Sequence, residues 1–130
     1  MYEVRFYNDS DYETICDWWD SWGWSKFPKE FLPKTGIVIE YQGQPICAGF
    51  VYKTDSLVAW SENYILNKDC PREARSGCIP RLIDEMCEQA IKMGASVLMS
   101  SVETKSLIRK LEEKGFQVGD TGMVNLVKAL

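Results

Sequence analysis

The chain has no histidine, so its candidate acid–base groups are carboxylates, phenols, thiols and amines. This excludes Ser-His and Cys-His nucleophile pairs and most zinc sites. Glu62 stands out in the apolar run AWSENYIL, where strict strand alternation puts it on one face with Trp60 and Tyr64. Between two aromatic side chains in a cleft, its pKa would be raised toward the range of a general base. The alternative is a solvated glutamate on the exposed face of a strand.

A second candidate is the basic stretch PREARSGCIPRLI, between a predicted strand and a predicted long helix. The start of a helix offers unpaired N–H groups and a partial positive charge, which together bind phosphates. We place this start at Ser76, with Gly77 next to it and Arg72 and Arg75 as flanking cations. Pro80 then falls in the first turn, where no donor is lost. The alternative is a plain helix start that happens to be basic.

The segment DWWDSWGW is a third candidate, because its tryptophans recur at helical spacing. An aromatic wall with nearby carboxylates suits an amine cation, and Asp20 and Trp24 are the members we expect to be exposed. The alternative is that the tryptophan face packs on the sheet as core.

Composition limits the function classes. A length of 130 residues predicts a single domain over 1–130, and a net charge of −4 with a pI near 4.9 disfavours a general nucleic-acid binder. We expect no membrane span and no secretory signal, since no apolar run is long enough to cross a bilayer and the start lacks a basic segment before an apolar one. The 5 cysteines show no C-x-x-C spacing, so we predict no disulfide framework, no metal site and a reducing cytoplasm.

The order of predicted elements indicates an α/β fold with helices on both faces of a mixed sheet. Three consecutive strands should form an antiparallel meander, and a later short apolar strand should be parallel and buried. The predicted strands are 2–7, 36–41, 46–53, 57–66, 96–102, 116–119 and 123–129, and the predicted helices are 8–22, 76–93 and 104–115.

Several landmarks occur in a specific order: a strand leading into a Gly-containing turn and long helix, then KMGA, a short strand, and a helix ending in LEEKGF. In this order the chain resembles the GNAT N-acetyltransferase superfamily over nearly its whole length. The length, the early WW and the string LPKTG also look like small acetyltransferase-like proteins of bacteriophages.

The resemblance implies transfer of an acetyl group from acetyl-CoA to an amine of a small molecule or protein, on a mostly antiparallel sheet. It implies that acetyl-CoA binds in a splayed cleft between strands 57–66 and 96–102, and that Glu62 is the base. The residues that match the family's substrate-binding positions are Asp20, Trp24, Trp60 and Tyr64. The residues that the resemblance predicts to bind the cofactor, of which only Gly77 matches the family's turn outright, are Ile65, Leu66, Arg72, Arg75, Ser76, Gly77, Cys78 and Ile79.

The chain departs from the family pattern at two places. Ala74 and Ile79 stand where the phosphate turn usually has Arg or Gln and Gly or Ala, and Leu111 stands where a helix Tyr often acts as the acid. The acid therefore stays open among serines and a bound water; the serines are Ser100, Ser101 and Ser106.

The departures leave an alternative function, a GNAT-fold protein without catalysis that binds a host or phage protein. A homodimer through the C-terminal strands or the meander edge is a further expectation.

Overall fold

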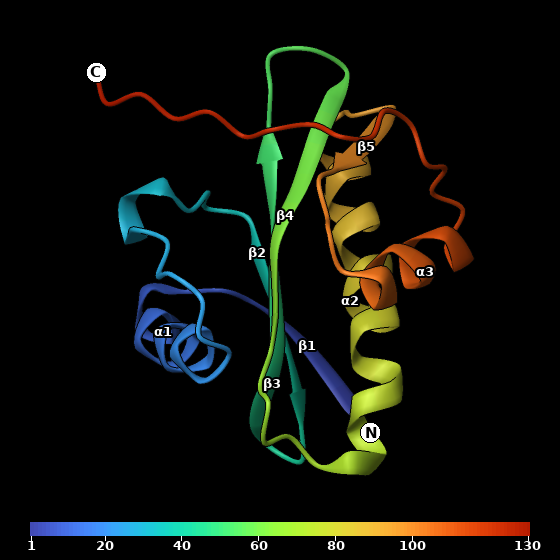
Figure 1. Cartoon of the computed structure of the whole chain (residues 1–130). Coiled ribbons are helices and arrows are strands. Elements are labelled where there is room, and N and C mark those ends of the chain that lie inside the picture. Colours follow the sequence, from blue (N-terminus) through green and yellow to red (C-terminus); the bar gives the residue numbers. More distant parts are fainter.

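The computed structural model describes residues 1–130 and contains one five-stranded sheet between two helical layers (Figure 1). The strands are β1 (Tyr2–Phe6), β2 (Gly36–Tyr41), β3 (Gln44–Lys53), β4 (Val58–Leu66) and β5 (Val97–Ser100). The helices are α1 (Tyr12–Ser21), α2 (Arg72–Lys92) and α3 (Lys105–Glu113), with short 3-10 turns η1 (Asp9–Asp11) and η2 (Lys29–Phe31).

The sheet has the order β1-β2-β3-β4-β5, antiparallel from β1 to β4 and parallel between β4 and β5. Figure 1 shows α1 on one face of this sheet and α2 with α3 on the other. The predicted α/β architecture, the meander and the parallel direction of the later strand are therefore confirmed. The prediction that this strand is buried is wrong, because β5 is an edge strand with exposed Val97 and Met99.

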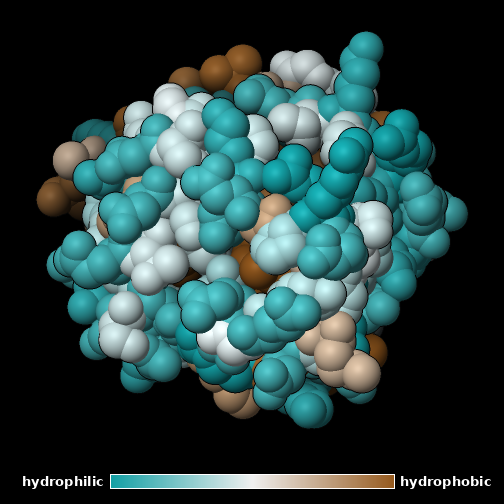
Figure 2. All heavy atoms as spheres, turned by 90° about the horizontal axis from the view of Figure 1, so that it is seen from below, coloured by the Kyte–Doolittle hydropathy of each residue, from teal (hydrophilic) through white to brown (hydrophobic).

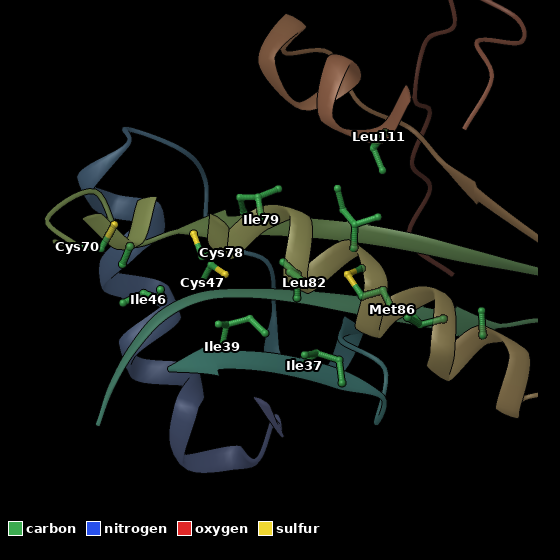
Figure 3. Packing of buried hydrophobic residues seen from close by; sticks show 14 of the residues in the cluster. Ile37, Ile39, Ile46, Cys47, Cys70, Cys78, Ile79, Leu82, Met86 and Leu111 are labelled. Atoms are coloured by element: carbon green, nitrogen blue, oxygen red, sulfur yellow. The ribbon is translucent and has the colours of Figure 1, made fainter. Parts of the chain in front are cut away.

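Each helical layer closes its own hydrophobic core. On the α2 face, Leu82 and Met86 pack with Ile39 and Cys47 of the meander (Figure 3). On the α1 face, Trp18 and Trp19 pack with a separate set of strand residues: Val38, Ala48, Phe50 and Ile65. Trp18 and Trp19 are 6% and 4% exposed, so the core interpretation of the tryptophan face holds for these two residues.

The long helix begins at Arg72, earlier than predicted, and Pro80 lies inside it. Pro71 immediately precedes the helix with φ −55°, which is the backbone angle that a helix needs. The residues that follow it, Arg-Glu-Ala-Arg, are good helix formers, so nothing delays the start to Ser76. The prediction of a helix start at Ser76 is therefore wrong.

The two predicted C-terminal strands, 116–119 and 123–129, are also wrong, because residues 116–130 form neither strand nor helix. No backbone hydrogen bond joins residues 117–130 to the rest of the chain. Their apolar side chains are exposed, with Leu126 at 90% and Val127 at 92%. A hairpin without further strands or a helix to pack on is marginal in water, and β5 offers an edge of only 4 residues.

Candidate functional site

The candidate site lies where β4 and β5 stop pairing. Their last pair is Ser61 with Ser100, and β4 continues beyond it to Leu66. At the same place β4 bulges: Phe50 pairs with Glu62 and Ala48 with Ile65, so two residues of β4 oppose one of β3. The edge of β4 that faces β5 is consequently unpaired beyond Ser61, which leaves a gap between two parallel strands.

Glu62 bridges this gap. Its Oε2 accepts a hydrogen bond from the Ser101 N–H at 3.0 Å, just beyond the end of β5. Burial raises the pKa of the Glu62 carboxyl, and the hydrogen bond from the Ser101 N–H offsets part of that rise. A carboxylate with a raised pKa accepts a proton more readily than a solvated one, which is the property a general base needs. The structure thus puts Glu62 beside a cavity, which is one of the two alternatives that the sequence left open.

Tyr64 does not share a face with Glu62, so that part of the prediction is wrong. The bulge centres on Asn63, whose φ of 58° lies in the left-handed region, and the extra residue reverses the alternation. Tyr64 packs with the α2 core instead, and its hydroxyl lies 2.6 Å from Ser61 Oγ.

Hydroxyl groups therefore gather at the end of the β4–β5 ladder. The Ser100 hydroxyl donates to the Ser61 carbonyl at 2.7 Å, and Ser61 in turn contacts Tyr64. Burial raises the pKa of the Tyr64 phenol and the contact with Ser61 offsets part of that rise, so the phenol stays protonated at neutral pH. Leu111, at the position where a helix tyrosine was expected from the resemblance, carries no hydroxyl and is buried in the core.

A cavity of about 380 Å³ adjoins Glu62. It lies between α1 with the loop that follows it, the bulged half of β4, and the segment from the end of β5 into α3. The residues that line it are Trp19, Trp24, Ser25, Phe27, Glu62, Asn63, Tyr64, Ser101, Val102, Glu103, Thr104 and Leu107.

Some of the residues predicted to bind the acceptor line this cavity, and others do not. Trp24 lines it and is 46% exposed, stacked on Trp22 with ring centroids 5.6 Å apart. Asp20 does not line the cavity; it pairs with Lys26 at 3.2 Å on the surface. Trp60 reaches the site only through its contact with Glu62.

Of the residues predicted to bind a phosphate group, some lie inside α2 and others remain exposed at its start. Since α2 begins at Arg72, N–H groups from Ser76 onward bond to the carbonyls four residues earlier, and the unpaired donors lie in the turn before. Gly77 is packed against Tyr2, whose hydroxyl would lie 2.5 Å from an added Cβ. Cys78 and Ile79 are core residues, 0% and 7% exposed. The prediction of free amides from Ser76 to Ile79 is therefore wrong.

The cations remain available at the start of α2. Arg72, Arg75 and Ser76 are exposed, and Arg75 Nη2 donates to the Lys68 carbonyl at 2.6 Å. Figure 2 views the molecule from this end and shows a mostly hydrophilic face around a small apolar recess.

The end of β4 is less open than predicted. Ile65 is 1% exposed and belongs to the α1-side core. The Leu66 carbonyl accepts a hydrogen bond from Trp22 Nε1 at 2.8 Å, so a ligand in the gap would compete with that indole for it.

A larger hollow of about 660 Å³ lies on the other side of residues 100–103, against α3 and residues 116–125. Glu62 does not line it, and residues 117–125 of its outer wall make no backbone hydrogen bond to the rest of the chain. The smaller cavity is the one that Glu62 lines. No group of three or more Cys, Asp or Glu side chains is arranged to hold a metal ion. None of the helices has the length and apolar character that crossing a membrane requires.

Sequence reasoning missed three residues of the site. Ser61 is fully buried, Asn63 makes the bulge, and Glu103 lines the cavity. Only Asn63 carried a signal, since asparagine is enriched at positive φ among residues other than glycine.

No family model matches the chain, and no curated protein matches its sequence. Solved structures do resemble it. A GNAT-family acetyltransferase from Streptococcus pneumoniae is similar with a TM-score of 0.71 and 13% identity, over 99% of this chain and 100% of that one. The chain has the GNAT acetyltransferase fold.

Two further structures with this fold carry more specific descriptions. A ribosomal-protein-alanine N-acetyltransferase from Brucella melitensis aligns with a TM-score of 0.71 and 14% identity, over 99% of this chain and 100% of that one. An N-acetylglutamate synthase from Neisseria gonorrhoeae, in complex with coenzyme A and N-acetyl-glutamate, aligns with a TM-score of 0.74 and 16% identity. That match covers 92% of this chain and 29% of the synthase. At these identities the likeness establishes the GNAT fold and leaves the substrate to the residues of the site.

Proposed function

We propose that the protein transfers an acetyl group from acetyl-CoA to an amine. The observation that carries the proposal is Glu62, a carboxylate with a raised pKa, held in the gap between β4 and β5 next to an aromatic-lined cavity. The GNAT fold and the coenzyme A bound to the synthase of the same fold support this reaction class.

The chemistry requires two proton movements. Glu62, directly or through a water, removes a proton from the ammonium group, and the neutral amine attacks the thioester carbonyl. A C–N bond forms, the C–S bond breaks, and coenzyme A leaves as a thiolate that takes up one proton. We propose that Tyr64, whose phenol contacts Ser61, returns that proton.

The proposal requires that acetyl-CoA binds with a different phosphate site from the one predicted. The unpaired N–H groups lie in the first turn of α2, and Arg72 and Arg75 add charge there, with Lys68 in the loop before them. We therefore propose that the pyrophosphate lies at Arg72–Arg75, with Ser76 at its margin. The pantetheine arm would run along the unpaired edge of β4 toward Glu62, past the Leu66 carbonyl.

Calorimetric titration with acetyl-CoA, and with coenzyme A for comparison, tests binding. Arg72→Ala should weaken acetyl-CoA binding several-fold, whereas Arg109→Ala, an equally exposed arginine on α3, should not. No binding at millimolar acetyl-CoA would refute the proposal.

Release of free coenzyme A with a panel of amines tests turnover. Glu62→Gln should lower kcat by about 10²- to 10⁴-fold while acetyl-CoA still binds. Glu88→Gln, an exposed glutamate on α2, is the matched control and should leave kcat unchanged. Unchanged turnover in Glu62→Gln would refute the role of the base even if acetyl-CoA binds.

The second candidate function, a GNAT-fold protein that binds another protein without catalysis, also has a specific observation in its favour. The C-terminal segment exposes several apolar side chains, and exposed apolar surface of this kind is typical of protein-binding sites. They are Val118, Met123, Val124, Leu126, Val127 and Leu130. This function predicts tight partner binding together with no acetyl-CoA binding.

A homodimer is the simplest partner for that segment. β5 is an edge strand with its outer side unpaired, and it carries exposed Val97 and Met99 without any charged residue. We propose that residues 123–129 of one copy pair with β5 of another. Sedimentation or size-exclusion analysis should show a dimer that Leu126→Lys dissociates; Ile91→Lys, an exposed apolar position on α2, is the control.

We also propose a reducing compartment, the cytoplasm, as the location. All 5 cysteines are free thiols, and Cys16, Cys47, Cys70 and Cys78 are buried. The resemblance to bacteriophage-encoded proteins stays a prediction from the sequence.

A further inference from the structure

The cavity beside Glu62 has an unusual charge inventory for an amine-binding site. Its only charged residues are two glutamates, Glu62 and Glu103, and neither lysine nor arginine lines it. An acceptor that carried a carboxylate would meet two carboxylates with no compensating cation, at a place where burial already disfavours negative charge on Glu62. Amino acids and acidic amines are therefore poor candidates for the acceptor.

The walls of the cavity complement an aliphatic chain. Trp19, Phe27 and Leu107 supply apolar surface, and Trp24 lies half-exposed within the same lining. An indole face attracts a cation in addition to covering methylene groups. The volume of about 380 Å³ falls at the lower end of ligand pockets, so it suits a small molecule.

The two glutamates lie at different depths. Glu62 is half-buried, and its carboxylate accepts a hydrogen bond from the Ser101 N–H. Glu103 is exposed and lies two residues after Ser101 in the chain. Two residues of chain span at most roughly 7 Å. One ammonium group at Glu62 and a second at Glu103 would therefore be about one short alkyl chain apart.

We propose that the acceptor is an aliphatic amine with a second cationic group, of the size of 1,4-diaminobutane or 1,5-diaminopentane. The reacting nitrogen lies at Glu62, the alkyl chain lies against the aromatic wall, and the second ammonium group pairs with Glu103. That the bound amine is an acetyl acceptor rests on the proposed acetyl transfer. The binding site itself can be tested without acetyl-CoA.

Binding is measured first, through the tryptophan fluorescence that Trp19 and Trp24 provide inside the cavity. The protein is titrated with 1,4-diaminobutane, butylamine and glutamate, at low and high salt. The diamine should bind most tightly and lose affinity as salt rises, and glutamate should not bind. Glu103→Gln should weaken diamine binding about two- to fivefold and leave butylamine unchanged. Glu113→Gln, an exposed glutamate on α3, is the matched control.

Turnover with acetyl-CoA is then measured for the same amines. If butylamine or glutamate is bound and acetylated as well as the diamine, the inference is overturned while the transferase function stands. If the diamine binds in a Glu103-dependent manner and no amine is acetylated, the dication site stands and the transferase function fails. Equal diamine affinity in Glu103→Gln and the parent protein overturns the role of Glu103.

Discussion

Gly77→Ala distinguishes the phosphate turn that the sequence suggests from the helix interior that the structure shows. In the structure Gly77 lies inside α2, and an added Cβ would meet the Tyr2 ring with its hydroxyl at 2.5 Å. That hydroxyl donates to the Ala74 carbonyl at 2.7 Å, and the ring packs on Tyr41 with centroids 5.7 Å apart. The new methyl group therefore displaces a side chain that joins β1 to the start of α2.

The magnitude follows from three contributions. Alanine is better than glycine inside a helix by about 1 kcal/mol. Displacing Tyr2 loses a hydrogen bond of about 1 kcal/mol and an aromatic contact of about 1 kcal/mol. Gly77→Ala should therefore destabilise the parent protein by about 1 kcal/mol, yet stabilise a Tyr2→Ala background by about 1 kcal/mol, where only the helix preference remains.

Urea unfolding of the four proteins of this cycle, followed by tryptophan fluorescence, measures the coupling between the two positions. Calorimetry with acetyl-CoA is run on the same samples, and the affinity of folded Gly77→Ala should match that of the parent protein. The opposite pattern, unchanged stability with at least tenfold weaker acetyl-CoA binding, would show that Gly77 meets the cofactor and that our interpretation of α2 is wrong.

Three further predictions concern ionisable groups. Asp11→Ala should lower the unfolding free energy by about 2 kcal/mol, because Asp11 is 7% exposed and accepts hydrogen bonds of 2.7 and 2.8 Å from Arg5. The partial exposure of Arg5 keeps this cost below that of a fully buried ion pair. Burial opposes ionisation of Asp11, but the hydrogen bonds from Arg5 and Asn8 hold its pKa below the ordinary 3.8. The stabilisation by Asp11 should therefore persist near neutral pH and vanish as the pH falls through that lowered pKa, which urea titrations at several pH values measure. For Glu62 the sign is reversed: burial raises the pKa above the ordinary 4.5, so Glu62→Gln should raise the unfolding free energy at pH 7 and change it little below pH 4.5. The acid limb of the acetylation rate should accordingly have a midpoint above 4.5 in the parent protein, and a midpoint at or below 4.5 in a pH-rate profile would contradict the burial of that carboxyl.

Local patterns in the sequence determined most of the architecture. The hairpin GIVIEY-QGQP-ICAGFVYK, the period of the helices and the short apolar run before α3 each reflect side chains that neighbour one another along the chain. For the same reason the sequence located Glu62 on a strand, and it offered core packing of the tryptophan face as one of two alternatives. Composition alone removed histidine chemistry.

Pairing between distant segments decided the rest. Strict alternation put Glu62 and Tyr64 on one face, but the register of β3 against β4 inserts an extra residue at Asn63 and turns Tyr64 toward Ser61. The role of Gly77 depends on Tyr2, which is remote in sequence and meets α2 only after β1 joins the sheet.

The C-terminal segment illustrates the same limit. MVNLVKA has the composition of a strand, but a strand also needs an edge to pair with, and in this chain the segment remains unpaired and exposed. Sequence thus determined which elements form and which residue types can do chemistry. Tertiary structure decided which groups meet, because a bulge, a helix start and a sheet edge each depend on contacts between residues far apart in the chain.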